Sequence, residues 1–221
     1  MLYLLSYAPL ANSTYGRGVA AQNGIAPYVD ASCRREPDFE LDSAFVSGLC
    51  RPRFIATLAV GDVLVYVTKK STVHREGRRL VAVLQLNRPF ASHAAAAAWY
   101  QAKGLRVPYS CIVPGNDPLP IDLTNPNMTS ASRAAQYADS KVWDRFVYKP
   151  RAKGSVKCFP CSALFLNLHA PPIVNDEFWV QFGCDPKRTQ NAGLALQQGV
   201  YDALLKHAGI LPVSIPFVPL A

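Results

Sequence analysis

The chain has 221 residues, of which 50% are hydrophobic and 10% aromatic, so it carries enough apolar material for a buried core and is not intrinsically disordered. Its 23 Lys and Arg residues against 15 Asp and Glu residues give a net charge of +8, which favours a polyanionic partner. No stretch is long and apolar enough for a transmembrane helix, and the segment from Met1 to Leu10 lacks the basic start of a signal peptide. We therefore expect a soluble, cytoplasmic protein that makes no membrane contact.

The positive charge is concentrated in one part of the sequence. Residues 45–110 sum to +8, whereas residues 1–44 sum to −2 and residues 111–221 to +2. Such a concentration suits nucleic acid or a nucleotide, because phosphates that are neutralised by protein cations release their counterions. The alternative is a solvated basic face that only keeps the protein soluble.

Strands are predicted in the first half of the chain. The apolar start, Met1 to Leu10, indicates the first strand of the fold. A Val-Gly-Asp turn at 60–62 leads into a β-branched and aromatic run at 63–68, and a second apolar run covers 80–86. These two runs predict an antiparallel hairpin whose long connection, residues 69–79, is basic.

Helix signals follow the hairpin. Ser92 is a good N-cap for a helix that runs to Lys103, with five alanines inside it and Gly104 at its end. Residues 106–130 contain five prolines, which predicts a long irregular excursion of the kind that is often functional or wraps another surface. A further helix is predicted from Ser130 toward Trp143.

The last third of the chain contains further candidate elements. Short strands are predicted at Ala163–Leu168 and Phe178–Phe182, on either side of a Pro-Pro pair. A helix is predicted from an N-cap at Asp185 to a stop at Gly209, because apolar residues recur at helical spacing between them. The apolar, proline-rich segment 210–220 is expected to pack onto the body as extended chain.

Together these elements predict an α+β fold. The strands point to a mixed, mainly antiparallel β-barrel with peripheral helices, and the 18 prolines favour long loops over a helical bundle. Neither an internal repeat nor a dividing linker is evident. We therefore expect a single domain over residues 1–221, with a core of about 1–105 and 155–209 and a loop and helix insertion at 106–154.

An ordered set of short motifs resembles a known family. Asn23-Gly24-Ile25-Ala26-Pro27 is followed by Cys33, by Cys50-Arg51-Pro52-Arg53, by the Gly61-Asp62 turn into a strand, and by a helix that contains Trp99-Tyr100. This order is similar to that of the nucleotide modification associated domains, particularly the second of that group. The wider scheme resembles the PUA-like barrels, which include the EVE, ASCH and YTH families. The resemblance covers residues 1–105 and, more loosely, 161–173.

The resemblance implies a fold and a ligand class. A member of this group would have a PUA-like barrel and would bind nucleic acid or a modified nucleotide, with DNA base-modification enzymes as partners. The group is defined by its association with base-modification systems and not by a reaction. The resemblance therefore implies no catalytic mechanism, and the catalytic residues stay unknown.

Nine basic residues are candidate phosphate contacts. The adjacent Arg34 and Arg35, followed by Glu36, would present a phosphate-binding fork or else a surface ion-pair cluster that caps a short helix. The other candidates flank the predicted hairpin, where they would line a groove or merely make its tip soluble. The full set is Arg34, Arg35, Arg51, Arg53, Lys69, Lys70, Arg75, Arg78 and Arg79.

A second set of residues is the candidate pocket for a base. Aromatic side chains supply stacking worth roughly 1–3 kcal/mol per base, although most aromatics at these spacings lie in a core. The candidates are Asn23, Gly24, Tyr28, Tyr66, Trp99 and Trp143.

The six cysteines give only a weak indication of a metal site. Cys158 and Cys161 form a CxxC pair, but the remaining candidate ligands, His169 and Cys184, lack the close spacing of a second zinc pair. Reduced thiols without a metal are therefore the expectation. The sequence also lacks a glycine-rich phosphate loop and a dinucleotide fingerprint, so we expect no cofactor.

Three functions stay open at this point. The leading hypothesis is a binding module whose affinity comes from the basic residues at 51–79 and whose selectivity comes from a pocket near Asn23. The second is an enzyme acting on a nucleotide or base, with Cys33, Glu36 or His74 taking part. The third is a structural partner that docks another protein through residues 210–221.

Overall fold

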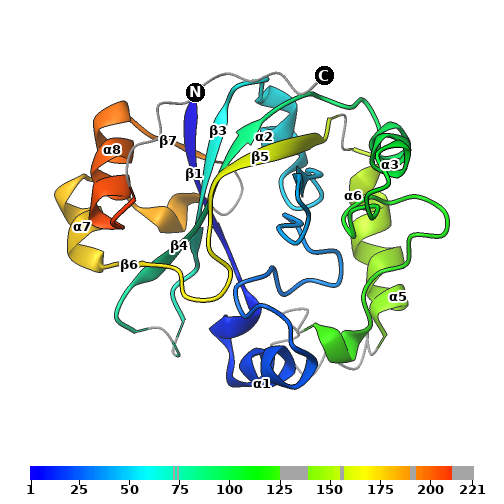
Figure 1. Ribbon diagram of the computed structural model, residues 1–221, viewed down its shortest axis with the longest axis horizontal. Helices are drawn as coiled ribbons and strands as arrows, with labels where there is room; N and C mark the ends of the chain where they lie inside the picture. Colours follow the sequence, from blue (N-terminus) through cyan, green and yellow to red (C-terminus); the bar gives the residue numbers. More distant parts are fainter. Residues whose placement is uncertain (72, 74, 125–138, 155–156, 190–192, 211–221) are drawn as a thin grey trace.

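A seven-stranded sheet organises the computed structural model, which describes all residues except 72, 74, 125–138, 155–156, 190–192 and 211–221 (Figure 1). The strands are β1 (Leu2–Tyr7), β2 (Ala44–Val46), β3 (Val63–Thr68), β4 (Arg78–Leu86), β5 (Phe159–Leu166), β6 (Ile173–Val174) and β7 (Leu194–Ala195). They are ordered β2-β5-β4-β3-β1-β7, with β6 paired to β4. Among the described strands, β1 and β3 are the one parallel pair, and the other pairs are antiparallel. The protein is thus an α+β protein with a mixed, mostly antiparallel sheet.

The sheet differs from the expected barrel at its edges. Among the described residues, no pairing joins β2 to β7, and both are very short strands of three and two residues. Short edge strands offer few free backbone groups for a closing ladder. The closed barrel predicted from the strand pattern is therefore not found, whereas the mixed, mainly antiparallel pairing is confirmed.

Helices cover both faces of this sheet (Figure 1). The helices are α1 (Thr14–Asn23), α2 (Pro52–Thr57), α3 (His93–Ala102), α5 (Ser140–Trp143), α6 (Lys149–Ala152), α7 (Asp176–Gln181) and α8 (Gln198–His207). Shorter turns are η1 (Leu10–Asn12), η2 (Ile121–Leu123) and η4 (Pro186–Thr189), and the π-turn η3 (Asp144–Tyr148) joins α5 to α6. In the ribbon view α7 and α8 lie on one side of the sheet, and α2, α3, α5 and α6 lie on the other. Within the described residues, no helix has the length and apolarity needed to span a bilayer.

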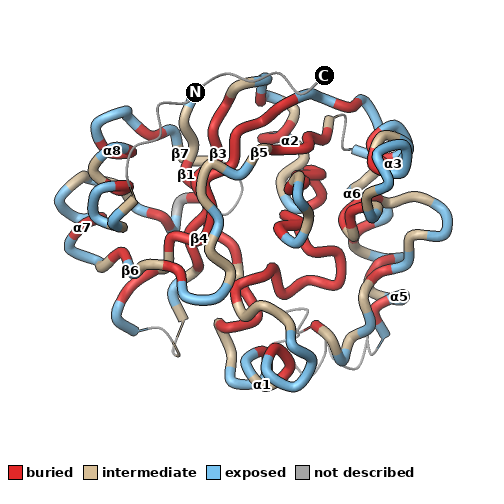
Figure 2. The backbone as a smooth tube through the Cα atoms, in the orientation of Figure 1, coloured by how far each residue is buried: buried red, intermediate tan, exposed pale blue. Residues whose placement is uncertain are grey.

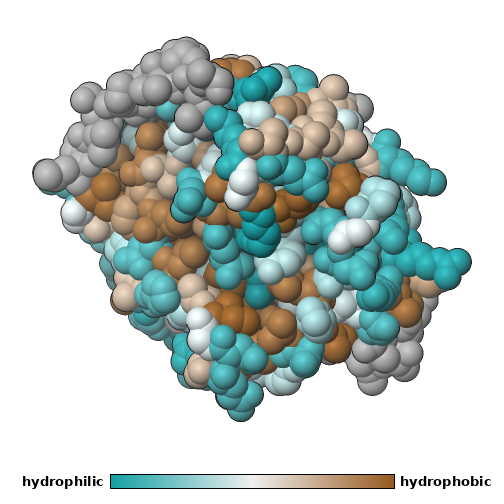
Figure 3. Space-filling view, turned by 45° about the vertical axis from the view of Figure 1, so that its right-hand side comes forward, coloured by the Kyte–Doolittle hydropathy of each residue, from teal (hydrophilic) through white to brown (hydrophobic). Residues whose placement is uncertain are grey.

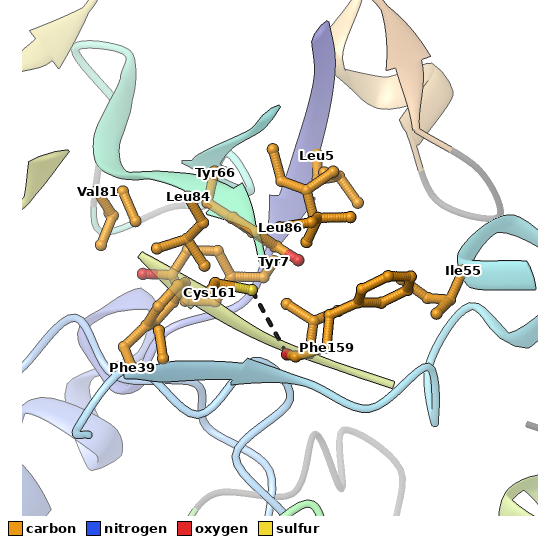
Figure 4. Close-up of a cluster of buried hydrophobic side chains, with 14 of the residues drawn as sticks. Leu5, Tyr7, Phe39, Ile55, Tyr66, Val81, Leu84, Leu86, Phe159 and Cys161 are labelled. Atoms are coloured by element: carbon orange, nitrogen blue, oxygen red, sulfur yellow. Dashed lines mark hydrogen bonds between the residues drawn. The ribbon is translucent and has the colours of Figure 1, made fainter. Parts of the chain in front are cut away.

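Alternation along the strands divides the core into two layers. On β3, Val63, Val65 and Val67 face the apolar side chains of α7 and α8. Leu64 and Tyr66 point to the opposite layer, which includes Phe159 and Leu84 (Figure 4). Because side chains alternate between faces in a strand, the almost unbroken apolar run of β3 predicts burial on both sides.

The second layer is completed by a loop that the sequence marks as polar. Residues 28–39 are all buried, although they include charged side chains, and they run through the interior beside the sheet (Figure 2). Phe39 from this loop packs edge-on against Tyr7 and Tyr66, with ring centroids 5.4 Å from each. The expectation of an exposed ion-pair cluster capping a short helix here is therefore wrong.

The outer face formed by α3, α5 and α6 is mixed in polarity. Figure 3 shows hydrophilic and hydrophobic residues side by side where this side of the molecule comes forward. Phe146 and Val142, in the helix made by α5, η3 and α6, are exposed. Single exposed apolar side chains of this kind are common and do not by themselves mark a binding surface.

Several predicted elements are confirmed. The first strand, the hairpin of β3 and β4, and the strand at 163–168 are found, the last one shifted to 159–166. Helix α3 begins after Ser92, whose hydroxyl accepts a hydrogen bond from the Ala95 amide at 3.1 Å. Residues 106–124 are irregular apart from η2, as the prolines indicated.

Two predictions in the last third are wrong. Phe178–Phe182 lies mostly in helix α7, because Asn175 caps that helix by accepting from the Phe178 amide at 3.1 Å and two acids follow the cap. The last helix begins at Gln198 and not after Asp185. Asp185 caps only the short turn η4, and Leu194 lies in strand β7, where it pairs with Leu4 of β1.

Two further predictions fall on residues that are not described. The helix expected from Ser130 lies outside the described residues up to position 138, and the helix that begins at Ser140 continues past Trp143 to Ala152. The tail is described only at Ile210, so its predicted packing lies outside the described residues.

Two glycines of α1 give a matched test of this packing. A Cβ atom at Gly16 would lie 2.0 Å from the carbonyl oxygen of Leu10, whereas one at Gly18 would meet nothing within 4 Å. Gly16→Ala is expected to destabilise the protein by about 2–3 kcal/mol because backbone must move. Gly18→Ala is expected to stabilise it by about 0.5–1 kcal/mol through helix propensity. Urea denaturation of both variants measures the difference, and equal effects would contradict this packing.

Candidate functional site

Because β1 and β3 are parallel, their C-terminal ends lie side by side at one edge of the sheet. Parallel strands finish on the same side, so Ser6 and Tyr7 of β1 lie beside Val67 and Thr68 of β3. Lys69 and Lys70 follow β3 directly. The hairpin then returns to this edge at Arg78, the first residue of β4.

The turn η4 is fastened across this edge. The backbone amide of Ser6 donates to the Thr189 hydroxyl at 3.0 Å, and the two hydroxyl oxygens lie 2.6 Å apart. Arg51 joins the same strand and turn, because its Nη2 donates to the Ser6 carbonyl at 2.5 Å and its Nε to the Thr189 carbonyl at 3.2 Å. Arg51, a predicted phosphate contact, thus holds Lys187 and its neighbours in η4 next to the strand ends.

Two adjoining recesses open between these elements, and we call them together the basic cleft. The smaller recess, of about 170 Å³, is lined by Ser6, Lys69, Lys70, Arg78 and Lys187. The larger, of about 450 Å³, shares three of these cations and is otherwise lined by Asp176, Trp179, Val180, Gly183, Cys184, Asp185 and Pro186. The cleft therefore has a purely basic end and an end that carries two carboxylates and an indole.

Arg78 is the buried cation that both recesses share. Its side chain is buried, and its Nη1 donates to the Thr68 carbonyl at 2.9 Å. Within the described residues it forms no ion pair with a carboxylate. Burial lowers the pKa of Arg78, and the charges of Asp176 and Asp185 oppose that shift. An arginine stays protonated at neutral pH, so the recess holds a positive charge with N–H groups left for a ligand.

The lysines around Arg78 add to this charge. Lys70 pairs with Asp176, an exposed pair in which both side chains stay accessible. Lys69 and Lys187 have no carboxylate partner in the part of the chain that the structure describes. A cluster of cations at a concave surface raises the local concentration of anions. The arrangement is thus chemically suited to binding a phosphate group.

Arg34, by contrast, is not available to a phosphate. Its guanidinium is buried and makes two parallel 2.6 Å hydrogen bonds, from Nε and Nη2, to the carboxylate of Asp144. Its Nη1 donates to the carbonyls of Tyr109 and Asn116 at 3.1 and 2.8 Å. The predicted phosphate fork is therefore a structural ion pair that joins the buried loop to η3.

Arg35 has a similar structural role. It is buried, its Nη1 donates to the Asp30 carbonyl and its Nη2 to the Leu123 carbonyl, and its Nε lies 3.4 Å from a carboxylate oxygen of Glu40. Arg35 also lines a separate recess of about 330 Å³ together with Asn23, Ile25, Glu40, Tyr109, Leu119 and Leu123.

The remaining predicted cations lie apart from the basic cleft. Arg79 donates to a Glu76 carboxylate oxygen at 2.6 Å and to the Pro171 carbonyl at 3.2 Å. Arg53, on α2, and Arg75, ahead of β4, are exposed and line none of the three recesses described above. Three of the nine predicted cations, Lys69, Lys70 and Arg78, therefore meet in the cleft.

The residues predicted to form a base pocket do not meet in one place. Tyr28 and Tyr66 are buried core residues, and Trp99 packs on Phe90 and Tyr100 in a separate cluster. Trp143 packs beside a third cluster. Gly24 ends α1 with a positive φ of 63°, as a helix-stopping glycine does. Of these six residues, Asn23 alone lines one of the three recesses described here, the recess of Arg35.

Two cleft residues, Lys187 and Trp179, are absent from the predicted phosphate contacts and base pocket. Both line the larger recess, and Trp179 is nine-tenths buried with an indole N–H that no described acceptor engages. Trp179 lies in the segment that the sequence analysis assigned to a strand. The Asp185-Pro186-Lys187 order was visible as a helix start, but nothing local indicates that this start lies beside β1.

The thiols show no metal-binding arrangement in the part of the chain that is described. No group of three or more His, Cys, Asp or Glu side chains converges there. The buried thiols of Cys158 and Cys161 donate to backbone carbonyls, of Phe90 at 3.7 Å and Phe159 at 3.5 Å. His169 is exposed, and Cys184 lines the basic cleft instead. The weak zinc candidates therefore do not come together.

Two of the three candidate catalytic residues of the enzyme hypothesis, Cys33 and Glu36, are placed away from the cleft. Cys33 is buried, and burial raises the pKa of its thiol to about 12, so it is no ready nucleophile. The carboxylate of Glu36 accepts from the amides of Ser47 and Gly48 inside the core. His74 lies outside the described residues.

Fold and cleft together define an α+β protein with a cation-lined cleft at the ends of two parallel strands. No family model, curated protein or solved structure matches the chain.

Proposed function

We propose that the chain is a nucleic-acid or nucleotide-binding module whose ligand phosphates bind in the basic cleft. The observation that carries the proposal is the buried guanidinium of Arg78, which faces two recesses and has no carboxylate partner among the described residues. Burying an unpaired charge is costly unless a counter-charge arrives. A solvated basic face kept only for solubility would have no need of a buried cation.

The sequence supports the nature of the ligand. The +8 charge of residues 45–110 includes three of the cleft cations, and Lys187 adds a fourth from a distant part of the chain. The motif order resembles that of the nucleotide modification associated domains with their PUA-like sheet. We extend the proposal on this basis to a role beside DNA base-modification enzymes.

Binding is favoured over catalysis by the chemistry of the cleft. Its one thiol, Cys184, has a raised pKa, chiefly through burial and also through the neighbouring Asp185. A thiol with a raised pKa is mostly protonated at neutral pH and is a weak nucleophile. The cleft cations, in contrast, need no activation to hold a phosphate.

A double substitution in the cleft tests the proposal. Lys69→Gln with Lys187→Gln is expected to weaken binding of a single-stranded oligonucleotide and to lower the slope of log K against log salt concentration by about 1.4, at ~0.7 per lost phosphate contact. Filter binding over a range of salt concentrations measures the slope.

The matched control removes two exposed lysines elsewhere. Lys153→Gln with Lys206→Gln changes the net charge equally but touches no residue of the cleft. This control is expected to keep the wild-type slope to within about 0.3. Equal slopes for the two double variants would show that charge alone, and not the cleft, determines binding.

A further inference from the structure

We infer that the basic cleft takes a nucleoside phosphomonoester, with the phosphate in the smaller recess and the nucleoside in the larger one. This inference rests on the proposed function and names the part of the nucleic acid that the site recognises. The shared chemistry is a terminal phosphate on a nucleoside, supplied either by a free mononucleotide or by the 5′ end of an oligonucleotide.

The smaller recess fits a doubly charged group. Four cations, Lys69, Lys70, Arg78 and Lys187, line it together with Ser6, and none of its lining residues is a carboxylate, although Lys70 also pairs with Asp176 of the larger recess. A phosphomonoester carries about −1.5 to −2 charges at pH 7, whereas each diester phosphate of a nucleic-acid backbone carries one. The guanidinium of Arg78 has five N–H donors, of which a single one engages the protein. The remainder match the three oxygens of a terminal phosphate.

The carboxylates of the larger recess disfavour a second phosphate group there. Asp176 and Asp185 both line it, so a second phosphate placed there would meet two negative charges. Sugar hydroxyls and exocyclic amino groups, in contrast, donate hydrogen bonds to carboxylates. The acids thus favour a neutral nucleoside beyond a single phosphate.

Trp179 offers this nucleoside a surface and a donor. Its side chain lines the larger recess, and its indole N–H is buried without an acceptor among the described residues. A buried donor that stays unpaired is costly, so an acceptor on the base that reached it from the recess would be favoured. The neighbouring Val180 is 81% exposed and adds apolar area at the rim. A volume of about 450 Å³ lies in the range of small-molecule sites.

The cleft is built before any ligand arrives. The hydrogen bonds of Ser6 with Thr189, and of Arg51 with both of their carbonyls, fix η4 against β1. Lys187, which lines both recesses, and Asp185, which lines the larger one, are therefore held in place on either side of Pro186. A preformed site does not have to order its own side chains on binding, which favours affinity for a small ligand.

Calorimetric titration of the full chain tests the inference. The ligands are the four 2′-deoxynucleosides, their 5′-monophosphates, and inorganic phosphate. At least one monophosphate is expected to bind 10-fold or more tightly than its nucleoside, with inorganic phosphate as a competitor. Arg78→Met is expected to weaken monophosphate binding about 10–100-fold and to weaken nucleoside binding much less, since Arg78 only borders the larger recess. Trp179→Phe is expected to weaken both ligands alike.

Controls separate binding from folding. Arg79→Met removes the adjacent guanidinium, which pairs with Glu76 outside the cleft, and is expected to bind as the wild type does. Arg78→Lys keeps the charge and loses the planar fork, so it serves if Arg78→Met fails to fold. Its monophosphate affinity is expected to be lower than that of the wild type and its nucleoside affinity to fall much less, and a monophosphate affinity equal to that of the wild type would contradict the role of the planar fork.

Oligonucleotides distinguish the two sources of the phosphate. They also separate a failure of this inference from a failure of the proposed nucleic-acid function. A 12-residue strand with a 5′-phosphate that outcompetes a monophosphate points to a strand end, and the reverse points to a free nucleotide. If strands with and without the terminal phosphate bind equally, the inference is overturned while the nucleic-acid function stands. If neither strands nor nucleotides bind, both are overturned.

Discussion

Asp144→Asn is expected to destabilise the protein by about 3–5 kcal/mol, the largest effect we predict for a single substitution away from the cleft. The Asp144 carboxylate is buried and receives two 2.6 Å hydrogen bonds from Arg34. The change to an amide leaves the buried guanidinium without its counter-charge and sets an NH₂ group against one of its donors. The desolvation cost of the buried guanidinium is then no longer offset by attraction to a carboxylate.

A double-mutant cycle measures this coupling in urea. Arg34→Met is expected to cost as much as Asp144→Asn, because Lys149 is the remaining cation, 3.8 Å from the Asp144 carboxylate and largely exposed. The combination Arg34→Met with Asp144→Asn is expected to cost less than the sum of the two single changes, since neither charge is then buried alone. Asp117→Asn, which removes the exposed pair with Lys141, is the control and is expected to leave the unfolding midpoint in place. If Asp117→Asn shifted the unfolding midpoint as far as Asp144→Asn does, the special cost of breaking the buried ion pair would be contradicted.

The burial of Arg34 also shows why some parts of the fold can be predicted from local sequence and others cannot. The hairpin of β3 and β4 and the helix α3 follow from signals within a few residues, namely a Gly-Asp turn, a β-branched run and a Ser cap. Arg34 carries the same kind of local signal as an exposed arginine. Its partner Asp144 lies 110 residues away, so its burial has no local signature.

The candidate site follows the same rule. Lys69, Lys70 and Arg78 are predicted from the sequence, because charge along a hairpin is a local property. The groups that convert these cations into a cleft, Trp179 and Lys187, come from segments more than 100 residues later. They reach the hairpin because Thr189 of η4 is hydrogen-bonded to Ser6, and because β6, which precedes α7, pairs with the first residues of β4. Closure of the predicted barrel fails for a related reason, since alternation predicts strands but not the pairing of their edges.

The second large effect concerns pH. Glu36 is buried against Ser47 and Gly48, and burial raises its pKa from 4.5 to about 7, although the hydrogen bonds that it accepts act in the opposite direction. Between these two values the folded protein binds more protons at this site than the unfolded chain does. Stability from this group is therefore fully present below pH 4.5 and is lost as the pH rises through 7, by about 3 kcal/mol in all.

His93 acts in the opposite sense and must be separated from Glu36. Burial lowers the pKa of His93 from 6.5 to about 4, so its contribution to stability grows as the pH rises between those values. Wild-type stability is then expected to change little from pH 4.5 to 6.5 and to fall above 6.5. Glu36→Gln is expected to convert this profile into a rise between pH 4 and 6.5, and His93→Gln into a steady fall between pH 4.5 and 7. Urea midpoints of the three proteins from pH 4 to 8 decide the matter, because a Glu36→Gln profile parallel to the wild type would mean that the buried carboxyl does not titrate in this range.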